Sequence, residues 1–483
     1  MEFDAVVVNG HVVMPGCGTL EADVAVKGER VAALLEPGGG AAYGSARRID
    51  ASGKYVLPGV VDPHTHFGLG GGLDDWASES RSAAAGGVTT VLNFLMSSQP
   101  YDAEYRLNRD AADRLSYVDY GLHVCPSSTE HLADLPRYIS EYGITSYKYF
   151  TSFRGNEGQY LGIQGTDDGY FYQYLRLVAR YAGGIACLHA ENIEVTWQLR
   201  RELQAAGRDD LAAWDESRPD WVEADCVQRG MLFARQTGAP LYLVHVSAAL
   251  CLEEIRAARR RWPELGVYVE TCPHFLTHTS DTVFTPHTLG KINPPLRHPW
   301  DVKALWAGLA DGTVDTIGSD HVARRKEKKG GSIWTSSAGF PGTGAILPVL
   351  LSEGLHKRGL PIERIVELTA SNPARIFGLY PRKGTLAVGA DADLVVVDLE
   401  EERVCSAATF QSRADYSLYD GWTLKGWPVL TMVRGEIVMQ DGRIVGRQGR
   451  AAYLPRTATL RGSAGGEASP LFRQDKSPDT VVT

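Results

Sequence analysis

The stretch "PGVVDPHTHF" at residues 58–67 places two histidines, His64 and His66, at the end of an apolar run. Positions i and i+2 of a β-strand lie on the same face, so both imidazoles can reach one cation. Taken alone, the stretch also fits a turn with two ordinary polar side chains, because glycines follow it. The pattern of the remaining chain has to separate these two interpretations.

Seven further apolar runs follow in the middle of the chain, and stretches of helical composition separate most of them. The runs are residues 89–96, 120–125, 144–150, 184–190, 240–247, 267–274 and 313–320. Strands that alternate with helices predict βα units and a parallel sheet. With the run that ends at residue 61, the count is about eight, which predicts an α/β fold of the TIM (β/α)8 barrel type.

Both ends of the chain differ from this middle. They carry short apolar runs interrupted by turn pairs such as Asn9-Gly10 and Asp441-Gly442, a pattern typical of β-hairpins. Because chain termini often lie close together, we expect the two ends to form one small β-sandwich. The predicted domains are 1–56 and 381–450 for the β-sandwich, 57–380 for the catalytic barrel, and 451–483 for a polar C-terminal arm.

Composition and charge exclude several classes of partner. The net charge is -9 and the basic residues are scattered, which argues against nucleic acid or an anionic membrane. No apolar run reaches the ~18 residues of a spanning helix, and the acidic N-terminus lacks the order of a signal peptide. Seven cysteines without a CxxC pair indicate buried thiols. We therefore expect a cytoplasmic protein that binds neither nucleic acid nor membrane.

Polar residues of ligand type stand at or near the ends of several predicted strands. Each has an ordinary alternative, since a histidine can be a satisfied strand-end residue, a lysine can snorkel and an aspartate can cap a helix. In a barrel, however, the C-terminal ends of all strands converge on one mouth, so these residues would meet. They are His64, His66, Lys148, His189, His245, Asp320 and His321.

The chemistry of this set suits zinc, except for the lysine. Imidazole and carboxylate are ligands of zinc and its borderline neighbours. An ammonium group would repel Zn²⁺, but burial can deprotonate Lys148. The free amine can react with CO2, and the resulting carbamate supplies two anionic oxygens that can bridge two metals.

At this point the motifs resemble those of the cyclic amidohydrolases in the amidohydrolase superfamily, in particular dihydropyrimidinases and hydantoinases. The similarity runs from about residue 4 to residue 447 and includes "PGVVDPHTHF", "SYKYF", "CLHAEN", "PLYLVHVS", "CPHFL", "NPPLR" and "GSDHV". The resemblance implies a TIM barrel with a β-sandwich from both chain ends, a homotetramer, and a small cyclic amide as substrate.

The resemblance also implies a binuclear zinc site. On that pattern His64, His66 and Asp320 hold the more buried zinc, and His189 and His245 hold the other. Carboxylated Lys148 bridges the two ions. A hydroxide shared by both metals would attack the ring amide, with Asp320 as general acid–base. His321 corresponds to a group behind the ligands.

Three positions depart from the pattern of that family. Phe153 stands where hydantoinases and dihydropyrimidinases carry an oxyanion-stabilising tyrosine, although Tyr149, Tyr160 and Tyr170 are near in sequence. Ala338 replaces an asparagine that contacts the ring. Asn293 stands where a serine is frequent. With His321, the residues Phe153, Asn293 and Ala338 are the candidate substrate contacts.

Two further features concern the substrate itself. Gly68 stands where a dihydroorotase has an arginine for a carboxylate, so the sequence favours a neutral ring over dihydroorotate. The loop at 154–170 is polar and glycine-rich, which predicts a different or less bulky apolar substituent than hydantoinases accept.

Three functional hypotheses remain. The first is metal-dependent hydrolysis of a cyclic amide C–N bond in a dihydropyrimidine, hydantoin, imide or lactam ring. The second is an allantoinase or another cyclic ureide hydrolase. The third is a non-catalytic dihydropyrimidinase-like scaffold protein, which the filled set of six ligand positions disfavours.

Overall fold

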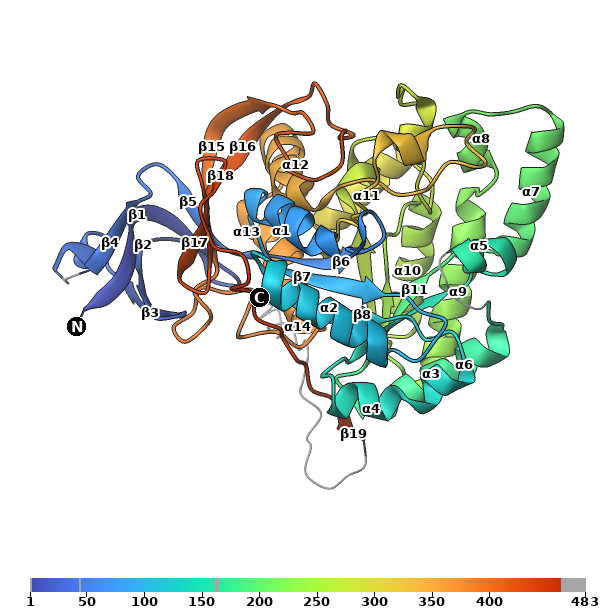
Figure 1. Cartoon of the computed structure of the whole chain (residues 1–483), viewed down its shortest axis with the longest axis horizontal. Coiled ribbons are helices and arrows are strands. Elements are labelled where there is room, and N and C mark those ends of the chain that lie inside the picture. The colour runs from blue at the N-terminus through green and yellow to red at the C-terminus, as the bar shows by residue number, and fades with distance from the viewer. Residues whose placement is uncertain (1, 43–44, 161–164, 462–483) are drawn as a thin grey trace, which may run out of the picture.

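The computed structural model describes residues 2–42, 45–160 and 165–461. Its centre is an eight-stranded parallel sheet that is nearly closed into a barrel (Figure 1). The strands are β6 (Val60–Thr65), β7 (Val88–Leu95), β8 (Asp119–Val124), β9 (Ser146–Phe150), β11 (Ile185–His189), β12 (Leu241–Leu243), β13 (Val267–Thr271) and β14 (Thr316–Ile317). A parallel bridge between Thr65 and His321 brings the first and last strands together. The predicted barrel is confirmed.

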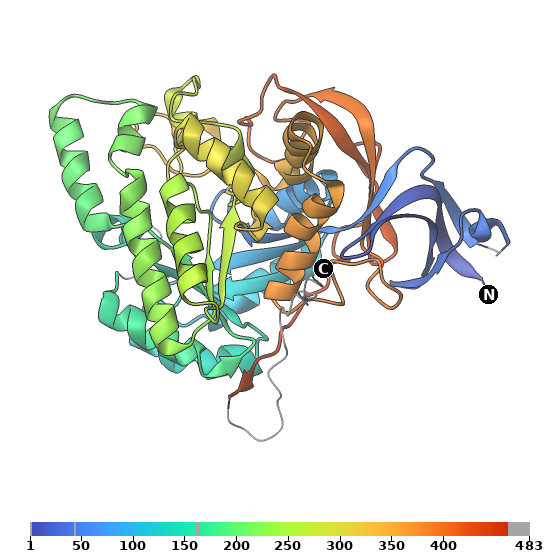
Figure 2. The same ribbon diagram turned by 180° about the vertical axis from the view of Figure 1, so that it is seen from behind.

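Helices follow the barrel strands and cover the outside of the barrel (Figure 2). The α-helices are α1 (Asp75–Ala85), α2 (Asp102–Leu115), α3 (Thr129–Ala133), α4 (Leu135–Ser140), α5 (Gly155–Tyr160), α6 (Asp168–Val178), α7 (Ile193–Ala205), α8 (Leu211–Glu216), α9 (Asp220–Thr237), α10 (Ala249–Arg261), α11 (Pro299–Asp311), α12 (Ile346–Val349), α13 (Ile362–Val366) and α14 (Asn372–Ile376). Short 3-10 turns are η1 (Gly39–Ala42), η2 (Gly72–Asp74), η3 (Pro273–Leu276), η4 (His287–Gly290), η5 (Lys326–Lys329) and η6 (Thr343–Ala345), and the π-helical segments are η7 (Leu350–His356) and η8 (Glu367–Ser371).

Several strands are shorter than the apolar runs that predicted them. The run at 240–247 forms hydrogen-bonded strand only at β12, and the run at 313–320 only at β14. In both, the chain leaves the strand before the predicted ligand, since His245 and Asp320 have positive φ angles of 41° and 49°. Such backbone is costly for non-glycine residues and is concentrated at functional sites.

The two chain ends come together, as the sequence predicted, and their strands form one mixed sheet. Its order is β18-β17-β16-β15-β5-β1-β2-β3, with β4 also paired to β1. The antiparallel pairing of β15 with β5 joins the C-terminal strands to the N-terminal ones. The strands are β1 (Phe3–Met14), β2 (Gly18–Lys27), β3 (Arg30–Leu35), β4 (Ser45–Asp50), β5 (Tyr55–Pro58), β15 (Leu394–Val404), β16 (Thr423–Val433), β17 (Glu436–Gln440) and β18 (Arg443–Ile444).

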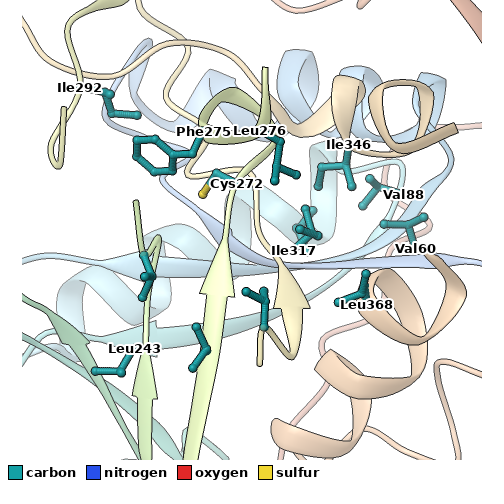
Figure 3. Close-up of a cluster of buried hydrophobic side chains, with 14 of the residues drawn as sticks. Val60, Val88, Leu243, Cys272, Phe275, Leu276, Ile292, Ile317, Ile346 and Leu368 are labelled. Carbon is teal, nitrogen blue, oxygen red and sulfur yellow. The ribbon is translucent and has the colours of Figure 1, made fainter. Parts of the chain in front are cut away.

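A continuous hydrophobic core joins the barrel strands to the helices around them. Figure 3 shows part of it, with Val60, Val88 and Ile317 of the strands beside Ile346 and Leu368 of the covering helices. Burying one such side chain contributes about 1.5–3 kcal/mol. A separate hydrophobic cluster contains Tyr242 and Phe377 together with residues of β6, β7 and β11. The barrel strands therefore also pack against the side chains of this second cluster.

The C-terminal segment lies against the barrel as far as it is described. Its last strand, β19 (Thr459–Leu460), pairs with β10 (Tyr181–Ala182), and Arg456 donates from Nη1 to Ser146 Oγ over 2.6 Å. Of the predicted arm at 451–483, the structure describes residues 451–461, and residues 462–483 lie outside the described part.

Two other expectations from composition can be compared with the structure. Six of the seven cysteines are buried and free, whereas Cys17 is free but exposed because it lies in the turn between β1 and β2. In the described ranges, none of the helices has the length and apolar character needed to cross a membrane.

Candidate metal centre and substrate cavity

The barrel brings six predicted ligands to one mouth. His64 and His66 stand at the end of β6, Lys148 lies in β9, and His189 is the last residue of β11. His245 and Asp320 follow β12 and β14. All six are buried, with at most 8% of any residue exposed. Because parallel strands end at the same edge, residues up to 256 positions apart in the sequence come within contact distance.

Three of these residues converge at atoms that carry lone pairs. His64 Nε2 lies 3.3 Å from His66 Nε2, and Asp320 Oδ1 lies 3.2 Å from each of them. Four tetrahedral ligands at the 2.0–2.1 Å distance of zinc would be about 3.3 Å apart. The triangle therefore fits a metal ion, and these three residues are a buried His-His-Asp metal-site candidate.

The other three residues adjoin this triangle. Lys148 Nζ lies 2.8 Å from His64 Nε2. His189 Nδ1 lies 2.8 Å from His245 Nε2, and the rings of His64 and His245 are stacked with centroids 5.4 Å apart. Nδ1 of His66 and Nδ1 of His245 are buried without a hydrogen-bond partner. A second group of facing nitrogen atoms thus lies beside the first.

Burial shifts the ionisation of the whole cluster. It lowers the pKa of His64 and His245 well below the ordinary histidine value, and lowers the pKa of His189 as well. Burial also lowers the pKa of Lys148. For Asp320, burial favours the neutral acid, but the adjacent His64 and His66 hold its pKa well below the usual range. Neutral imidazole and ionised carboxylate are the ligand forms that metals require.

Glu270, in β13, positions two of the histidines and was missed in the sequence. Its Oε1 lies 2.6 Å from His64 Nδ1 and accepts from the His245 amide over 2.9 Å. Tyr242 donates its hydroxyl to Oε2 over 2.8 Å. Burial raises the pKa of Glu270 to about 8. A carboxylate bound to Nδ1 of a histidine fixes the ring so that Nε2 points to the metal.

A second missed carboxylate performs the same role for His189. Glu191 Oε2 lies 2.7 Å from His189 Nε2, and its Oε1 lies 2.9 Å from Arg218 Nη1. The available sequence signal for both residues was an acidic side chain within or directly after an apolar strand run, "VYVETC" and "CLHAEN".

Asp62 supports the loop that carries Asp320. Its Oδ2 accepts from Ser319 Oγ over 2.6 Å, and its Oδ1 accepts from the amides of His64 and Ser319. The first and last barrel strands are therefore tied together directly below two of the predicted ligands.

A cavity of about 660 Å³ opens onto this cluster. Phe153, Asn293 and Ala338 line it, as the sequence analysis suggested for substrate contacts. The Phe153 ring lies 5.2 Å from the His189 ring, measured between centroids. Oδ1 of Asn293 is buried without a hydrogen-bond partner. These residues give the cavity an apolar wall and one unsatisfied polar group.

His321 and the two tyrosines that are near Phe153 in sequence, Tyr149 and Tyr170, have hydrogen-bonding partners within the protein. His321 is buried, its Nε2 lies 2.9 Å from Glu79 Oε2, and its Nδ1 accepts from the amides of Gly342 and Thr343. Tyr149 donates its hydroxyl to Asp167 O and Tyr170 donates to Ser128 O, both over 3.0 Å. The side chain of Tyr160 lies outside the described residues. Neither Tyr149 nor Tyr170 therefore supplies the hydroxyl that Phe153 lacks.

Comparison with known proteins shows that the chain is similar to the amidohydrolase family and to hydantoinases. Residues 266–438 match the amidohydrolase family model. The chain is 34% identical to a D-hydantoinase of Geobacillus stearothermophilus over 90% of this chain and 93% of that protein. It is 33% identical to an L-hydantoinase of Paenarthrobacter aurescens, with 94% and 98% covered.

Comparison with solved structures also finds a similar enzyme of this family. A dihydropyrimidinase from Brevibacillus agri superimposes with a TM-score of 0.85 at 30% identity, covering 94% of this chain and 98% of that one. The similarity thus extends over the barrel and the terminal sheet together.

Proposed function

This chain belongs to the hydantoinase and dihydropyrimidinase branch of the amidohydrolase family, and we propose that it opens a dihydropyrimidine- or hydantoin-type ring with two zinc ions. Its reaction class is hydrolysis of a cyclic amide C–N bond. The observation that carries the proposal is the triangle of His64, His66 and Asp320, with Lys148, His189 and His245 directly beside it.

The residues divide into two groups of ligands. His64, His66 and Asp320 would hold one zinc, and His189 and His245 would hold the other. Lys148, carboxylated on its Nζ, would bridge them. Its buried position and lowered pKa favour the neutral amine, which is the form that reacts with CO2. When bound, two zinc ions would lower the pKa of a water and polarise the ring carbonyl.

The protein residues supply the proton transfer and the orientation. Asp320 lines the cavity and would take a proton from the attacking water and deliver it to the leaving ring nitrogen. Glu270 and Glu191 hold His64 and His189 in the orientation that this requires.

Substrate contacts would come from the cavity wall. The unpartnered Oδ1 of Asn293 can accept a hydrogen bond from a ring N–H. Phe153 contributes apolar surface, while the small side chain of Ala338 leaves room for a ring substituent. The homotetramer implied by the family resemblance and the cytoplasmic location expected from the composition are part of this proposal, and light scattering of the purified protein would test the first.

The test is metal content and turnover of the purified full-length protein. We expect about two zinc ions per chain and ring opening of hydantoin or dihydrouracil in a panel that includes allantoin, an imide and a lactam. Turnover of allantoin alone would replace the proposal with an allantoinase. Less than about one zinc per chain, with no gain in activity from added Zn²⁺ and bicarbonate, would favour the scaffold hypothesis.

Lysine carboxylation has its own measurement. Protein prepared in ¹³C-labelled bicarbonate should show a carbamate carbon signal by NMR that is missing in the Lys148→Ala variant. The same signal in both proteins would exclude Lys148 as the carboxylated residue.

A further inference from the structure

One part of the cavity wall has no role in the proposed metal centre. Three tryptophans line it, together with three cationic side chains that lie over the ring of Trp214 or Trp334; a fourth cation of the cavity, Arg324, instead donates to the carbonyl of Leu69. The three tryptophans and the three cations over them are Trp197, Trp214, Trp334, Arg200, Arg218 and Lys291. An apolar substituent would match the indoles but would offer no partner to a cation that the protein leaves without a counter-ion.

Two of the three cations are neutralised by carboxylates of the protein. Arg200 Nη1 lies 2.9 Å from Glu157 Oε1, and Arg218 Nη1 lies 2.9 Å from Glu191 Oε1. The charges of both guanidinium groups are therefore balanced without a ligand, although Nε of Arg218 is buried without a hydrogen-bond partner.

Lys291 differs from both arginines. Only 4% of the residue is exposed, its Nζ donates to the carbonyl of Ser336 over 2.7 Å, and the same atom lies 4.1 Å from the centre of the Trp214 ring. Within the described ranges, no carboxylate oxygen lies within the 4.0 Å of an ion pair. An ammonium has three donors, and a carbonyl satisfies one of them.

The electrostatic surroundings make this charge unfavourable as long as the cavity holds no anion. Burial, together with repulsion from Arg218 and Arg200, lowers the pKa of Lys291 to about 7, although the charges of Glu157 and Asp209 oppose this shift. A buried ammonium without a counter-ion is costly, whereas a paired one is tolerated.

The tryptophans are fixed in place as an apolar frame. Trp214 donates its indole N–H to Ile292 O and Trp334 donates to Arg208 O, both over 2.8 Å. Their ring centroids lie 5.9 Å apart. Because both N–H groups are satisfied by backbone, the rings offer only apolar surface to a ligand.

We propose that Lys291 binds a carboxylate on the substituent of the ring that the enzyme opens, with Trp214 and Trp334 flanking the carbon chain of that substituent. The inference rests on the proposed function, because the ring itself would be held at the metal centre. One uncompensated positive charge matches a monoanion, and a phosphate would introduce more negative charge than Lys291 alone neutralises. The substrate class is thus a neutral cyclic amide ring with an acidic side chain.

The experiment compares two hydantoins that differ only in charge. One has a carboxyethyl group on the substituted ring carbon, and the other has the neutral isostere, an isopentyl group. We expect the metal-loaded wild-type enzyme to have a kcat/KM at least about tenfold higher for the acid, since a hydrogen bond to a charged group contributes that much or more. A phosphonoethyl compound tests the nature of the anion.

Substitution of Lys291 should remove this preference selectively. Lys291→Met should lower kcat/KM for the acid by about 10- to 100-fold more than kcat/KM for the isopentyl compound, while Lys291→Arg should retain the preference. Lys303→Met, which removes an exposed positive charge in α11, is the matched control and should change neither substrate.

The outcomes separate this inference from the proposed function. Ring opening without preference for the acid in the wild type overturns the inference alone, even if the Lys291→Met variant does not fold. A preference for the phosphonate overturns the carboxylate assignment. If no ring is opened, calorimetric titration with the carboxyethyl compound still decides. Lys291-dependent binding supports the subsite while the proposed function fails, and its absence overturns the subsite.

Discussion

Two buried lysines lie toward opposite ends of the barrel strands, and their surroundings shift their pKa values in opposite directions. Burial lowers the pKa of Lys148 at the mouth, where its Nζ contacts a histidine nitrogen and the rings of Phe94 and Phe150. Burial would also lower the pKa of Lys383, but three carboxylates raise it instead.

The cluster around Lys383 is closed. Its Nζ lies 2.6 Å from Asp119, 2.7 Å from Asp393 and 2.9 Å from Asp391, and Asp119 also pairs with Arg434 over 3.0 Å. Asp119 is the first residue of β8. Lys383, Asp391 and Asp393 lie in the segment before β15, and Arg434 lies in the turn after β16. This network joins the barrel to the terminal sheet.

The difference teaches how the same residue type serves two purposes. A buried charge with a full set of partners fixes the arrangement of two parts of the fold, and removing one partner leaves an uncompensated charge. A buried amine without carboxylate partners is held in a reactive form, which is typical of functional sites. Substitution of Lys148 should therefore affect metal binding and activity, whereas substitution of Lys383 should affect the stability of the fold.

The largest effect is expected from Lys148→Ala. Metal binding and ring-opening activity should be lost, the latter by at least about 10³-fold, and short carboxylates should partly restore both by replacing the carbamate. The metal-free variant should lose less unfolding free energy than Lys383→Met does, because only packing and no ion pair is removed. Full activity in this variant would refute the bridging role.

Lys383→Met should have the opposite consequence. We expect a loss of about 3–5 kcal/mol in the free energy of unfolding, since three buried carboxylates lose their partner, while the folded fraction keeps its kcat. Chemical denaturation followed by circular dichroism measures the first quantity. Lys357→Met removes an exposed lysine from its i,i+4 pair with Glu353, which keeps Arg358 as a partner, and should cost at most about 1 kcal/mol. Equal effects of the two substitutions would contradict the comparison.

Glu270→Gln tests the support of the mouth cluster. The substitution keeps the shape but replaces the carboxyl group beside His64 with an amide that cannot ionise, and zinc affinity should fall about 10- to 100-fold. Competition with a chelating dye measures that affinity, and Glu253→Gln, on the exposed face of α10, is the control. Unchanged zinc affinity would show that Glu270 only satisfies buried polar groups.

The smallest effect concerns pH. Because the pKa of Lys383 is raised in the folded state, its stabilisation is fully present below the unfolded-state value of about 10.4 and is lost as pH rises through the folded value. The difference in unfolding free energy between wild type and Lys383→Met should stay constant from about pH 7 to about pH 10 and then shrink. A decrease already below about pH 9 would contradict the raised pKa.

Much of the fold and part of the site followed from local pattern. Apolar runs alternating with helical stretches predicted the barrel, and His64, His66, Lys148, His189, His245 and Asp320 were predicted as residues near strand ends that a barrel must bring together. The runs were less informative about strand ends, because hydrogen bonding stops before His245 and Asp320 while the apolar composition continues.

The sequence by itself determined which residue types stand at the mouth, since strand order and period decide where a strand-end side chain points. Only the tertiary structure decided their partners. Glu270 reaches His64 across 206 residues, Lys383 reaches Asp119 across 264, and Lys291, directly after η4, meets Trp214 of α8. The physical reason is that a charge acquires its pKa from desolvation and from neighbours in space, and neither is encoded in any local stretch of the chain.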